Sequence, residues 1–239
     1  MAHIITHSSL VFIFGILGNL VAFMVYLAPV PTFYSIYKKK TTGGFHSVPY
    51  IVALLSSMLW IYYATLKSNE ILLITINSFG CFIEAIYIFI YISYAPKLAR
   101  MVALKMLFLI NFVGFGLILV FTHYFVKGSQ QVQVLGWISV VLSISVYIAP
   151  LSIMSRVIRT KSVEFMPVAL SIALLFNAVM WFFYGLLLKD FFVAVPNVVG
   201  VIFGVVQIIL YLIYRNGKAN SEDKLPVTAV KPNCEIHPW

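Results

Sequence analysis

The segment Trp60–Gly80, WIYYATLKSNEILLITINSFG, is the most informative stretch for the fold. A diverged copy of it, Trp181–Gly200, WFFYGLLLKDFFVAVPNVVG, follows later in the chain. Each copy begins with a tryptophan and an aromatic run, crosses a short polar tip, and reaches Asn-x-x-Gly inside the next apolar run. An amide placed in hydrocarbon without a partner is costly. We therefore expect Asn77 and Asn197 either to be paired inside a helical bundle or to face a polar cavity.

The composition is that of a membrane protein. Of the 239 residues 62% are hydrophobic and 10% are charged, and the mean hydropathy is +1.01, whereas soluble domains carry about 25% charged residues. A membrane-spanning helix needs about 20 apolar residues. Seven runs approach or exceed that length and lack the alternation of barrel strands, which predicts an all-α membrane protein with seven transmembrane helices; they are 9–33, 48–66, 71–95, 103–126, 132–155, 168–188 and 192–214.

The net charge of +9 reflects the distribution of lysine and arginine between the two sides of a membrane. Thirteen of the 16 basic residues lie in the first, third and fifth connections and the C-terminal tail, and the other connections hold only Lys67, Lys127 and Lys189. By the positive-inside rule, this alternation predicts an outer N-terminus and a cytoplasmic C-terminus. It indicates a lipid bilayer as the partner, and not nucleic acid.

The sequence contains a tandem repeat of a three-helix unit. A shift of 121 residues, which becomes 120 after the polar tip, superposes a series of identical residues in order: Pro150 on Pro29, Trp181 on Trp60, Asn197 on Asn77 and Gly200 on Gly80. The repeats are 9–95 and 132–214. Because three is odd, the run 103–126 is needed as a linker helix to give both repeats the same orientation. The expected architecture is 3+1+3, two parallel three-helix bundles, with residues 215–239 as a disordered cytoplasmic tail.

Four prolines lie at the cytoplasmic ends of spans in the two repeats, namely Pro29, Pro49, Pro150 and Pro167. A proline removes a backbone hydrogen bond and kinks a helix. Prolines are common in membrane helices, and each of these, considered singly, is explained as a static kink. Their related positions favour a second interpretation, in which they are hinges of an inner gate.

Trp60, Trp181, Asn77 and Asn197 are expected to share one layer, on the order of 12 to 15 Å below the outer surface. Tryptophan is also typical of the interfacial aromatic belt, and asparagine also forms hydrogen bonds between helices. The repeated pairing of an indole with an amide favours a sugar site. A sugar presents a C–H face to the indole and hydroxyl groups to the amide, and it needs no buried counter-charge.

The remaining polar residues give two further hypotheses. Glu84 lies in a span, which makes it a candidate for proton coupling or for a structural hydrogen bond; residue 204, its counterpart, is glycine. An outer gate is expected where hydroxyl and carboxylate groups cluster at the polar tips, although the charged members also fit solvated turns; its candidates are Tyr63, Tyr184, Asp190 and Lys67. No enzyme motif occurs, and we expect no catalysis, cofactor or metal site.

Five stretches resemble the plant SWEET sugar transporters: LAPVPTF at Leu27–Phe33, LITIN at Leu73–Asn77, APLSIM at Ala149–Met154, KSVEFMP at Lys161–Pro167 and VPN at Val195–Asn197. The resemblance extends to about residue 214. It implies facilitated, bidirectional transport of mono- or disaccharides by alternating access, often by a homo-oligomer.

The resemblance also implies residue roles. The two tryptophans and two asparagines would line the sugar pocket, the prolines would serve the inner gate, and the size of the pocket would be set by Ser56, Ser143, Val146 and Asn177. Ser56 and Val146 are similar to sucrose-transporting members and Asn177 to hexose-transporting ones, so the substrate is sucrose, a hexose or both. The plasma membrane is the expected location, with the vacuolar membrane as the alternative.

Two other classes of protein are alternatives to a sugar uniporter. The first is a proton-coupled carrier of another small polar solute that uses Glu84. The second is a seven-helix receptor, which has no need for tandem three-helix units.

Overall fold

The computed structural model describes residues 2–67, 70–164 and 166–216, and these are helical apart from short connections. Within them, seven helical stretches are long and apolar enough to cross a membrane, which confirms the predicted number of spans; they are His7–Lys39, Val48–Leu66, Ile71–Tyr94, Lys97–Phe125, Ser129–Thr160, Val168–Leu187 and Phe191–Tyr214. The tail from residue 217 onward, which carries most of the expected disordered segment, lies outside the described residues.

Three of the spans are built from more than one helical segment, and the other four are continuous. The continuous spans are α3 (Val48–Leu66), α4 (Ile71–Tyr94), α9 (Val168–Leu187) and α10 (Phe191–Tyr214). The interrupted spans are the first, with α1 (Ala2–Leu27) and α2 (Val30–Lys39); the fifth, with α7 (Ser129–Ser145) and α8 (Ile148–Thr160); and the fourth, with α5 (Lys97–Met106), the π-helical η1 (Leu107–Gly114) and α6 (Phe115–Phe125).

The breaks in the first and fifth spans have the same cause. Pro29 and Pro150 have no N–H to donate to the carbonyls of Val25 and Val146, four residues earlier, so the hydrogen-bond ladder is open there. These two pairs of residues superpose under the shift of 121. The interruption is therefore a repeated feature of the fold.

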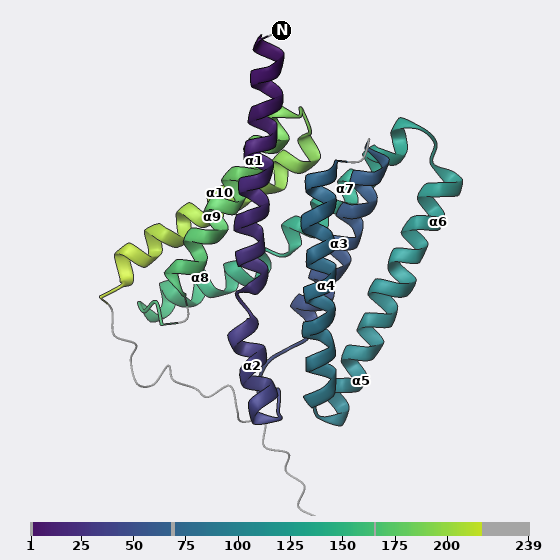
Figure 1. Cartoon of the computed structure of the whole chain (residues 1–239). Coiled ribbons are helices and arrows are strands. Elements are labelled where there is room, and N and C mark those ends of the chain that lie inside the picture. The colour runs from purple at the N-terminus through teal and green to yellow at the C-terminus, as the bar shows by residue number, and fades with distance from the viewer. Residues whose placement is uncertain (1, 68–69, 165, 217–239) are drawn as a thin grey trace, which may run out of the picture.

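Each half places its third helix between the other two. In the first half α4 packs between α1 and α3, and in the second half α10 packs between α7 and α9. Across the halves α1 packs on α9, and α3 packs on α7. Because α1 corresponds to α7 and α3 corresponds to α9, each of these two contacts is the counterpart of the other. This is the relation expected of parallel repeats (Figure 1).

The two ends of the bundle differ in chemistry, and we name them by their residues. The tip end carries the connections around Lys67 and Lys189, and it is the upper end in Figure 1. The basic end carries Lys40 and Lys161, which follow α2 and α8, and it is the end toward which α2 points. Lys40 Nζ hydrogen-bonds Tyr94 and Lys161 Nζ hydrogen-bonds Tyr214, which ties α2 to α4 and α8 to α10.

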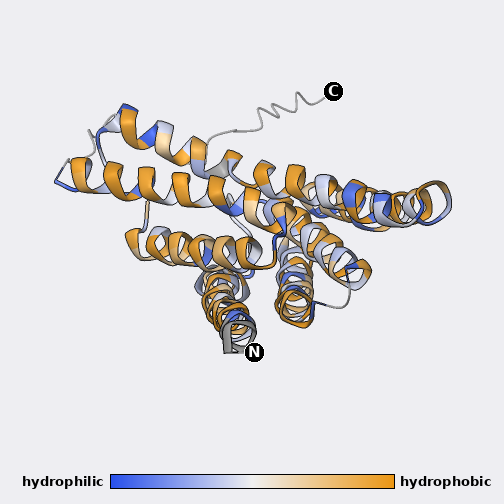
Figure 2. Ribbon diagram, turned by 90° about the horizontal axis from the view of Figure 1, so that it is seen from above, coloured by the Kyte–Doolittle hydropathy of each residue, from blue (hydrophilic) through white to orange (hydrophobic). Residues whose placement is uncertain are grey.

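The fourth span packs mainly against α3 of the first half. Asn111 in η1 donates a hydrogen bond of 3.1 Å to the carbonyl of Ile51, and the hydroxyls of Tyr62 and Thr122 are 3.0 Å apart. The other face of this span is apolar and exposed, with Phe112 at 73%. Large apolar side chains such as Phe12, Phe82 and Phe176 are also exposed on the other spans, and their ribbons are largely apolar in the view from above (Figure 2). Such a surface suits lipid.

The structure corrects several boundaries expected from the sequence. Helix α1 begins at Ala2, seven residues before the start of the first expected run, 9–33. The sequence predicts a connection between the runs 71–95 and 103–126, but the basic residues Lys97 and Arg100 of that connection lie on α5. Charged residues at a span end extend the helix beyond the hydrocarbon, and a hydropathy pattern does not detect such an extension.

The prediction of helix kinks at Pro49 and Pro167 is wrong. Pro49 lies in the first turn of α3, and Pro167 immediately precedes α9. A proline at the start of a helix replaces an N–H that would have no helical partner, so it removes no hydrogen bond. These two prolines mark the beginning of helices.

Candidate functional site

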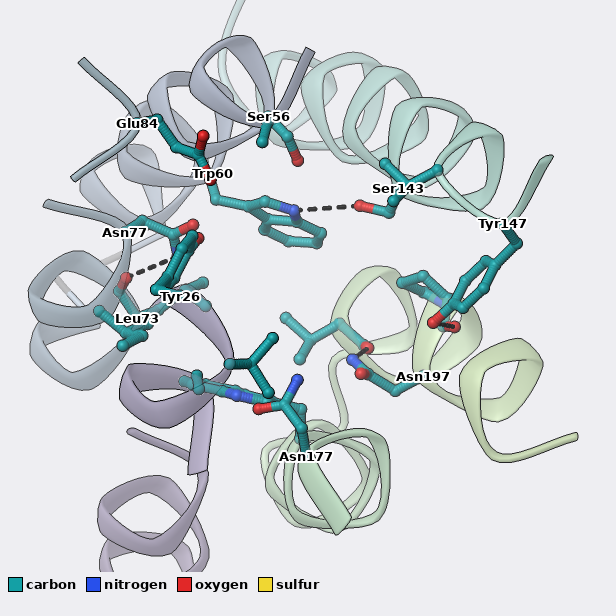
Figure 3. A pocket seen from close by; sticks show the side chains of 18 of the residues that line it. Tyr26, Ser56, Trp60, Leu73, Asn77, Glu84, Ser143, Tyr147, Asn177 and Asn197 are labelled. Atoms are coloured by element: carbon teal, nitrogen blue, oxygen red, sulfur yellow. Dashed lines mark hydrogen bonds between the residues drawn. The ribbon is translucent and has the colours of Figure 1, made fainter. Parts of the chain in front are cut away.

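A cavity of about 350 Å³ lies between the two halves, and it contains every residue expected at the sugar site (Figure 3). The first half supplies its side chains from α1, α3 and α4, and the second half from α7, α9 and α10. The eight expected residues that line it are Ser56, Trp60, Asn77, Ser143, Val146, Asn177, Trp181 and Asn197. Residues that are far apart in the sequence thus share one space.

The two tryptophans each pack edge-to-face on a tyrosine one turn closer to the tip end. The ring centroids are 5.4 Å apart for Trp60 and Tyr63, and 5.2 Å apart for Trp181 and Tyr184. Trp60 also donates its indole N–H to the hydroxyl of Ser143 at 3.2 Å, across the interface of the halves. The tryptophans therefore line the cavity and do not form an interfacial belt.

The two asparagines have matching local geometry. Asn77 Nδ2 donates to the carbonyl of Leu73 at 2.8 Å, and Asn197 Nδ2 donates to the carbonyl of Val193 at 2.7 Å. Both bonds run within one helix to the residue four positions earlier. Each amide retains its oxygen and its second N–H, for which the described residues provide no recorded hydrogen bond, so both groups are free for a polar guest.

Two tyrosines of the cavity were missed in the sequence analysis, although the 121-residue shift superposes them. Tyr26 and Tyr147 both line the cavity, and the hydroxyl of Tyr26 lies 3.1 Å from that of Ser57. A methyl group added at Gly80 would collide with the hydroxyl of Tyr26, and one added at Gly200 would collide with that of Tyr147. The repeated glycines therefore leave room for the repeated tyrosines.

The expected gate residues meet at the tip end. The hydroxyl of Tyr63 lies 2.9 Å from both carboxylate oxygens of Asp190, and Lys67 forms an ion pair with the same carboxylate. Asp190 also accepts hydrogen bonds from the backbone N–H groups of Phe192 and Val193, so it caps α10. Asp190 is 2% exposed. This network joins α3 of one half to α10 of the other.

Glu70 completes the tip end and was not assigned a role from the sequence. The shift of 120 superposes it on Asp190, and its carboxylate lies 3.7 Å from Lys67 Nζ. Its oxygen Oε2 is buried without a hydrogen-bond partner among the described residues. Burial raises the pKa of Glu70 above its usual 4.5, while Lys67 opposes the shift.

The four prolines are divided between three places. Pro29 lines the cavity, and Pro150 lines a smaller cavity of about 60 Å³ within the second half. Pro49 and Pro167 are exposed at the starts of α3 and α9. The structure thus places one of the four on the main cavity, and the hinge role stays a prediction.

Glu84 also lines the cavity, on the side of Asn77 and Trp60 (Figure 3). It is 5% exposed, and its Oε2 has no hydrogen-bond partner in the part of the chain that the structure describes. The expected structural hydrogen bond at this oxygen is therefore not found. No group of three or more metal-ligating side chains occurs among the described residues.

Comparison with known proteins gives concordant matches to sequence and structure. The family described as "Sugar efflux transporter for intercellular exchange" matches residues 12–99 and 133–219, which are the two halves without most of the linker helix. Bidirectional sugar transporter N3 of Medicago truncatula is 55% identical over 97% of this chain and 87% of its own length. Bidirectional sugar transporter SWEET13 of Oryza sativa subsp. japonica is 54% identical over 90% of this chain and 77% of its own length.

A solved structure of a eukaryotic SWEET transporter superposes with a TM-score of 0.84 at 34% identity, over 88% of this chain and 99% of that one. The duplicated three-helix fold and the cavity between its halves agree with these matches. The chain therefore belongs to the SWEET family of sugar transporters.

Proposed function

We infer that this chain carries sucrose, a hexose or both across a membrane in either direction, by alternating access and without catalysis. The observation that supports this most directly is the cavity between the repeats, with a tryptophan and an asparagine contributed by each half. The relatives named as bidirectional sugar transporters agree with it.

The cavity offers a sugar both kinds of contact that it needs. Trp60 and Trp181 supply aromatic surface for the C–H face of a pyranose ring. Asn77 and Asn197 supply an acceptor and a donor each, because only one N–H of each amide is used by the helix. Ser56, Ser143, Val146 and Asn177 border the same space and would set how large a sugar fits.

Alternating access requires that one end of the pathway is closed while the other opens. The bonds of Tyr63 and Lys67 to Asp190 close the tip end, with Tyr184 beside them as part of the same gate. We propose that Pro29 and Pro150, at the breaks of the first and fifth spans, are the hinges of the opposite gate. Pro49 and Pro167, at the starts of neighbouring helices, would let these helices tilt with it.

We propose that the tip end faces outside and the basic end faces the cytoplasm, because lysine and arginine gather at the basic end. The plasma membrane is the proposed location, with the vacuolar membrane as the alternative. A homo-oligomer is proposed from the family resemblance.

The proposal is tested by flux of radiolabelled sucrose and glucose in proteoliposomes. Wild-type protein should equilibrate at least one of these sugars, and Asn77→Ala and Asn197→Ala should each reduce the rate at least about tenfold, since each removes a hydrogen-bonding group from the site. Asn216→Ala, which changes an exposed residue after α10, is the matched control. Unchanged flux in both cavity variants would remove the assignment.

Glu84 provides a reason to test the proton-coupled alternative as well, because its carboxyl lines the cavity. An imposed proton gradient separates the two mechanisms. A uniporter equilibrates the sugar without accumulating it, whereas a coupled carrier accumulates it and loses that accumulation in Glu84→Gln.

A further inference from the structure

The two tryptophans of the cavity are equivalent in the repeat but differ in the partner of the indole N–H. Trp60 donates its N–H to the hydroxyl of Ser143 at 3.2 Å (Figure 3). The shift of 121 superposes Trp181 on Trp60 and Ala22 on Ser143, and Ala22 also lines the cavity. A methyl group accepts no hydrogen bond. Only the tryptophan of the first half therefore finds an acceptor at this position of the opposite half.

The indole of Trp181 is held by close packing. A methyl group added at Gly18, one helical turn before Ala22, would lie 3.2 Å from Trp181 Nε1 and 3.1 Å from its Cε2. The backbone of α1 thus approaches the edge of the ring that carries the N–H group. The ring also packs edge-to-face on Tyr184. These contacts fix the orientation of the ring without using its N–H.

The N–H of Trp181 needs an acceptor that the protein does not supply. The described residues provide no recorded hydrogen bond for Nε1, although Trp181 is only 6% exposed. A buried donor without a partner costs about 1 to 3 kcal/mol. Because Trp181 lines the cavity, a guest in the cavity is in a position to provide the acceptor.

We propose that Trp181 donates its indole N–H to a hydroxyl oxygen of the bound sugar, and that Ala22 preserves this contact because it offers no competing acceptor. A sugar hydroxyl accepts a hydrogen bond as readily as it donates one. The two tryptophans then have different tasks. Trp60, whose N–H is engaged by Ser143, offers the sugar only its ring face, whereas Trp181 adds a polar contact at its ring edge. Ala22 is thereby a residue that determines how tightly the sugar is held.

This inference rests on the proposed sugar transport, and the test keeps the two separate. The tracer is radiolabelled glucose or sucrose, whichever the wild type carries, and the measured quantity is the sugar concentration at half-maximal exchange in proteoliposomes. Ala22→Ser gives Trp181 the acceptor that Ser143 gives Trp60, so it should raise this concentration about fivefold, which corresponds to about 1 kcal/mol. Trp181→Phe keeps an aromatic ring and removes the N–H, and it should raise the concentration at least as much.

The combination of these changes separates a lost hydrogen bond from crowding of the cavity. In the Trp181→Phe background Ala22→Ser should add less than about twofold, because no N–H is left to engage, whereas in the Trp60→Phe background it should keep its full effect. Ala85→Ser, the same change on the exposed face of α4, is the matched control and should leave the half-maximal concentration unchanged.

Two results would overturn the proposal. The first is a full effect of Ala22→Ser in the Trp181→Phe background, which would reveal crowding alone. The second is an unchanged half-maximal concentration in Ala22→Ser or, if that variant fails to fold, in Trp181→Phe. Absence of exchange of both tracers by the wild type would instead refute the proposed function.

Discussion

The two halves share one skeleton but differ at both ends of the cavity. At the tip end, Asp190 of the second half binds Tyr63, Lys67 and two backbone N–H groups, whereas the corresponding Glu70 caps no helix and has a buried oxygen without a partner among the described residues. Only one of the two superposable carboxylates thus bonds to the opposite half of the protein. Duplication supplies two equivalent positions, and the proposed outer gate needs a strong bond at only one of them.

At the basic end the first half is the more tightly packed. Phe33 stacks on Tyr87 with 4.4 Å between ring centroids, and the hydroxyl of Tyr87 donates to the carbonyl of Tyr26. The corresponding residues of the second half are Met154 and Gln207. Gln207 lines the smaller cavity there. The difference indicates that α2 is held firmly on α4, while α8 is held less firmly on α10.

The largest effect is expected from the two acids at the tip end. Asp190→Ala leaves Tyr63 without its partner, leaves Lys67 only its longer contact with Glu70, and removes the cap of α10, so it should destabilise the protein by about 3 kcal/mol. Glu70→Ala should cost much less, because Glu70 makes only the longer contact with Lys67. Thermal unfolding in detergent compares the two variants. Equal losses of stability would contradict the asymmetry of the tip end.

A second comparison concerns the last helical turns of α3 and α9 before the tip end. Gly185 of the second half corresponds to Ala64 of the first, and a methyl group at Gly185 would lie 2.8 Å from the backbone nitrogen of Ala194. Gly185→Ala should therefore destabilise by about 2 kcal/mol through overpacking. Ala64→Gly, the reverse change, should cost about 1 kcal/mol. The same unfolding assay applies, and a neutral Gly185→Ala would show that the second half is less tight here than the structure indicates.

A third comparison concerns the hydroxyl pair of Tyr26, which lines the cavity, and Ser57. Ser57→Ala gives the first half the residue that the second half has as Ala178, and it removes the 3.1 Å contact with Tyr26. We expect a loss of about 1 kcal/mol, since a buried hydroxyl loses its partner. The control is Ser78→Ala on the exposed face of α4. If Ser57→Ala proves as neutral as this control, the pair does not stiffen the first half.

The repeat explains why much of this site was predictable. Trp60, Trp181, Asn77 and Asn197 follow from two superposable segments, and all four line the cavity. The same shift also indicates Tyr26, Tyr147 and Glu70, which were overlooked because aromatic and terminal acidic residues are common in membrane helices. The sequence does not specify the contact of Tyr63 with Asp190, because the packing of α3 beside α10 is a tertiary property. The role of this contact as an outer gate stays a prediction.

The smallest effect is expected from the charge of Glu70. Burial raises its pKa in the folded protein above 4.5, so the protonated form is favoured by folding. The stability that it contributes is present at low pH and is lost as the pH rises through the raised pKa. Glu70→Gln should then slightly increase the melting temperature at neutral pH, by less than Ser57→Ala lowers it, and reduce the dependence on pH between 4.5 and neutrality. A lower melting temperature of Glu70→Gln than of the wild type at neutral pH would contradict this prediction.

The central claim is that sugar occupies the cavity between the halves, and protection of a cysteine placed in its wall tests it most directly. Ala53 lines the cavity and has no proposed contact with sugar, so Ala53→Cys is introduced with Cys81 and Cys234 replaced by alanine. His46→Cys on the exposed connection before α3 is the control. A saturating concentration of the transported sugar should slow labelling of Cys at position 53 by a water-soluble thiol reagent at least about fivefold and leave position 46 unaffected. Equal labelling of position 53 with and without sugar would contradict the account.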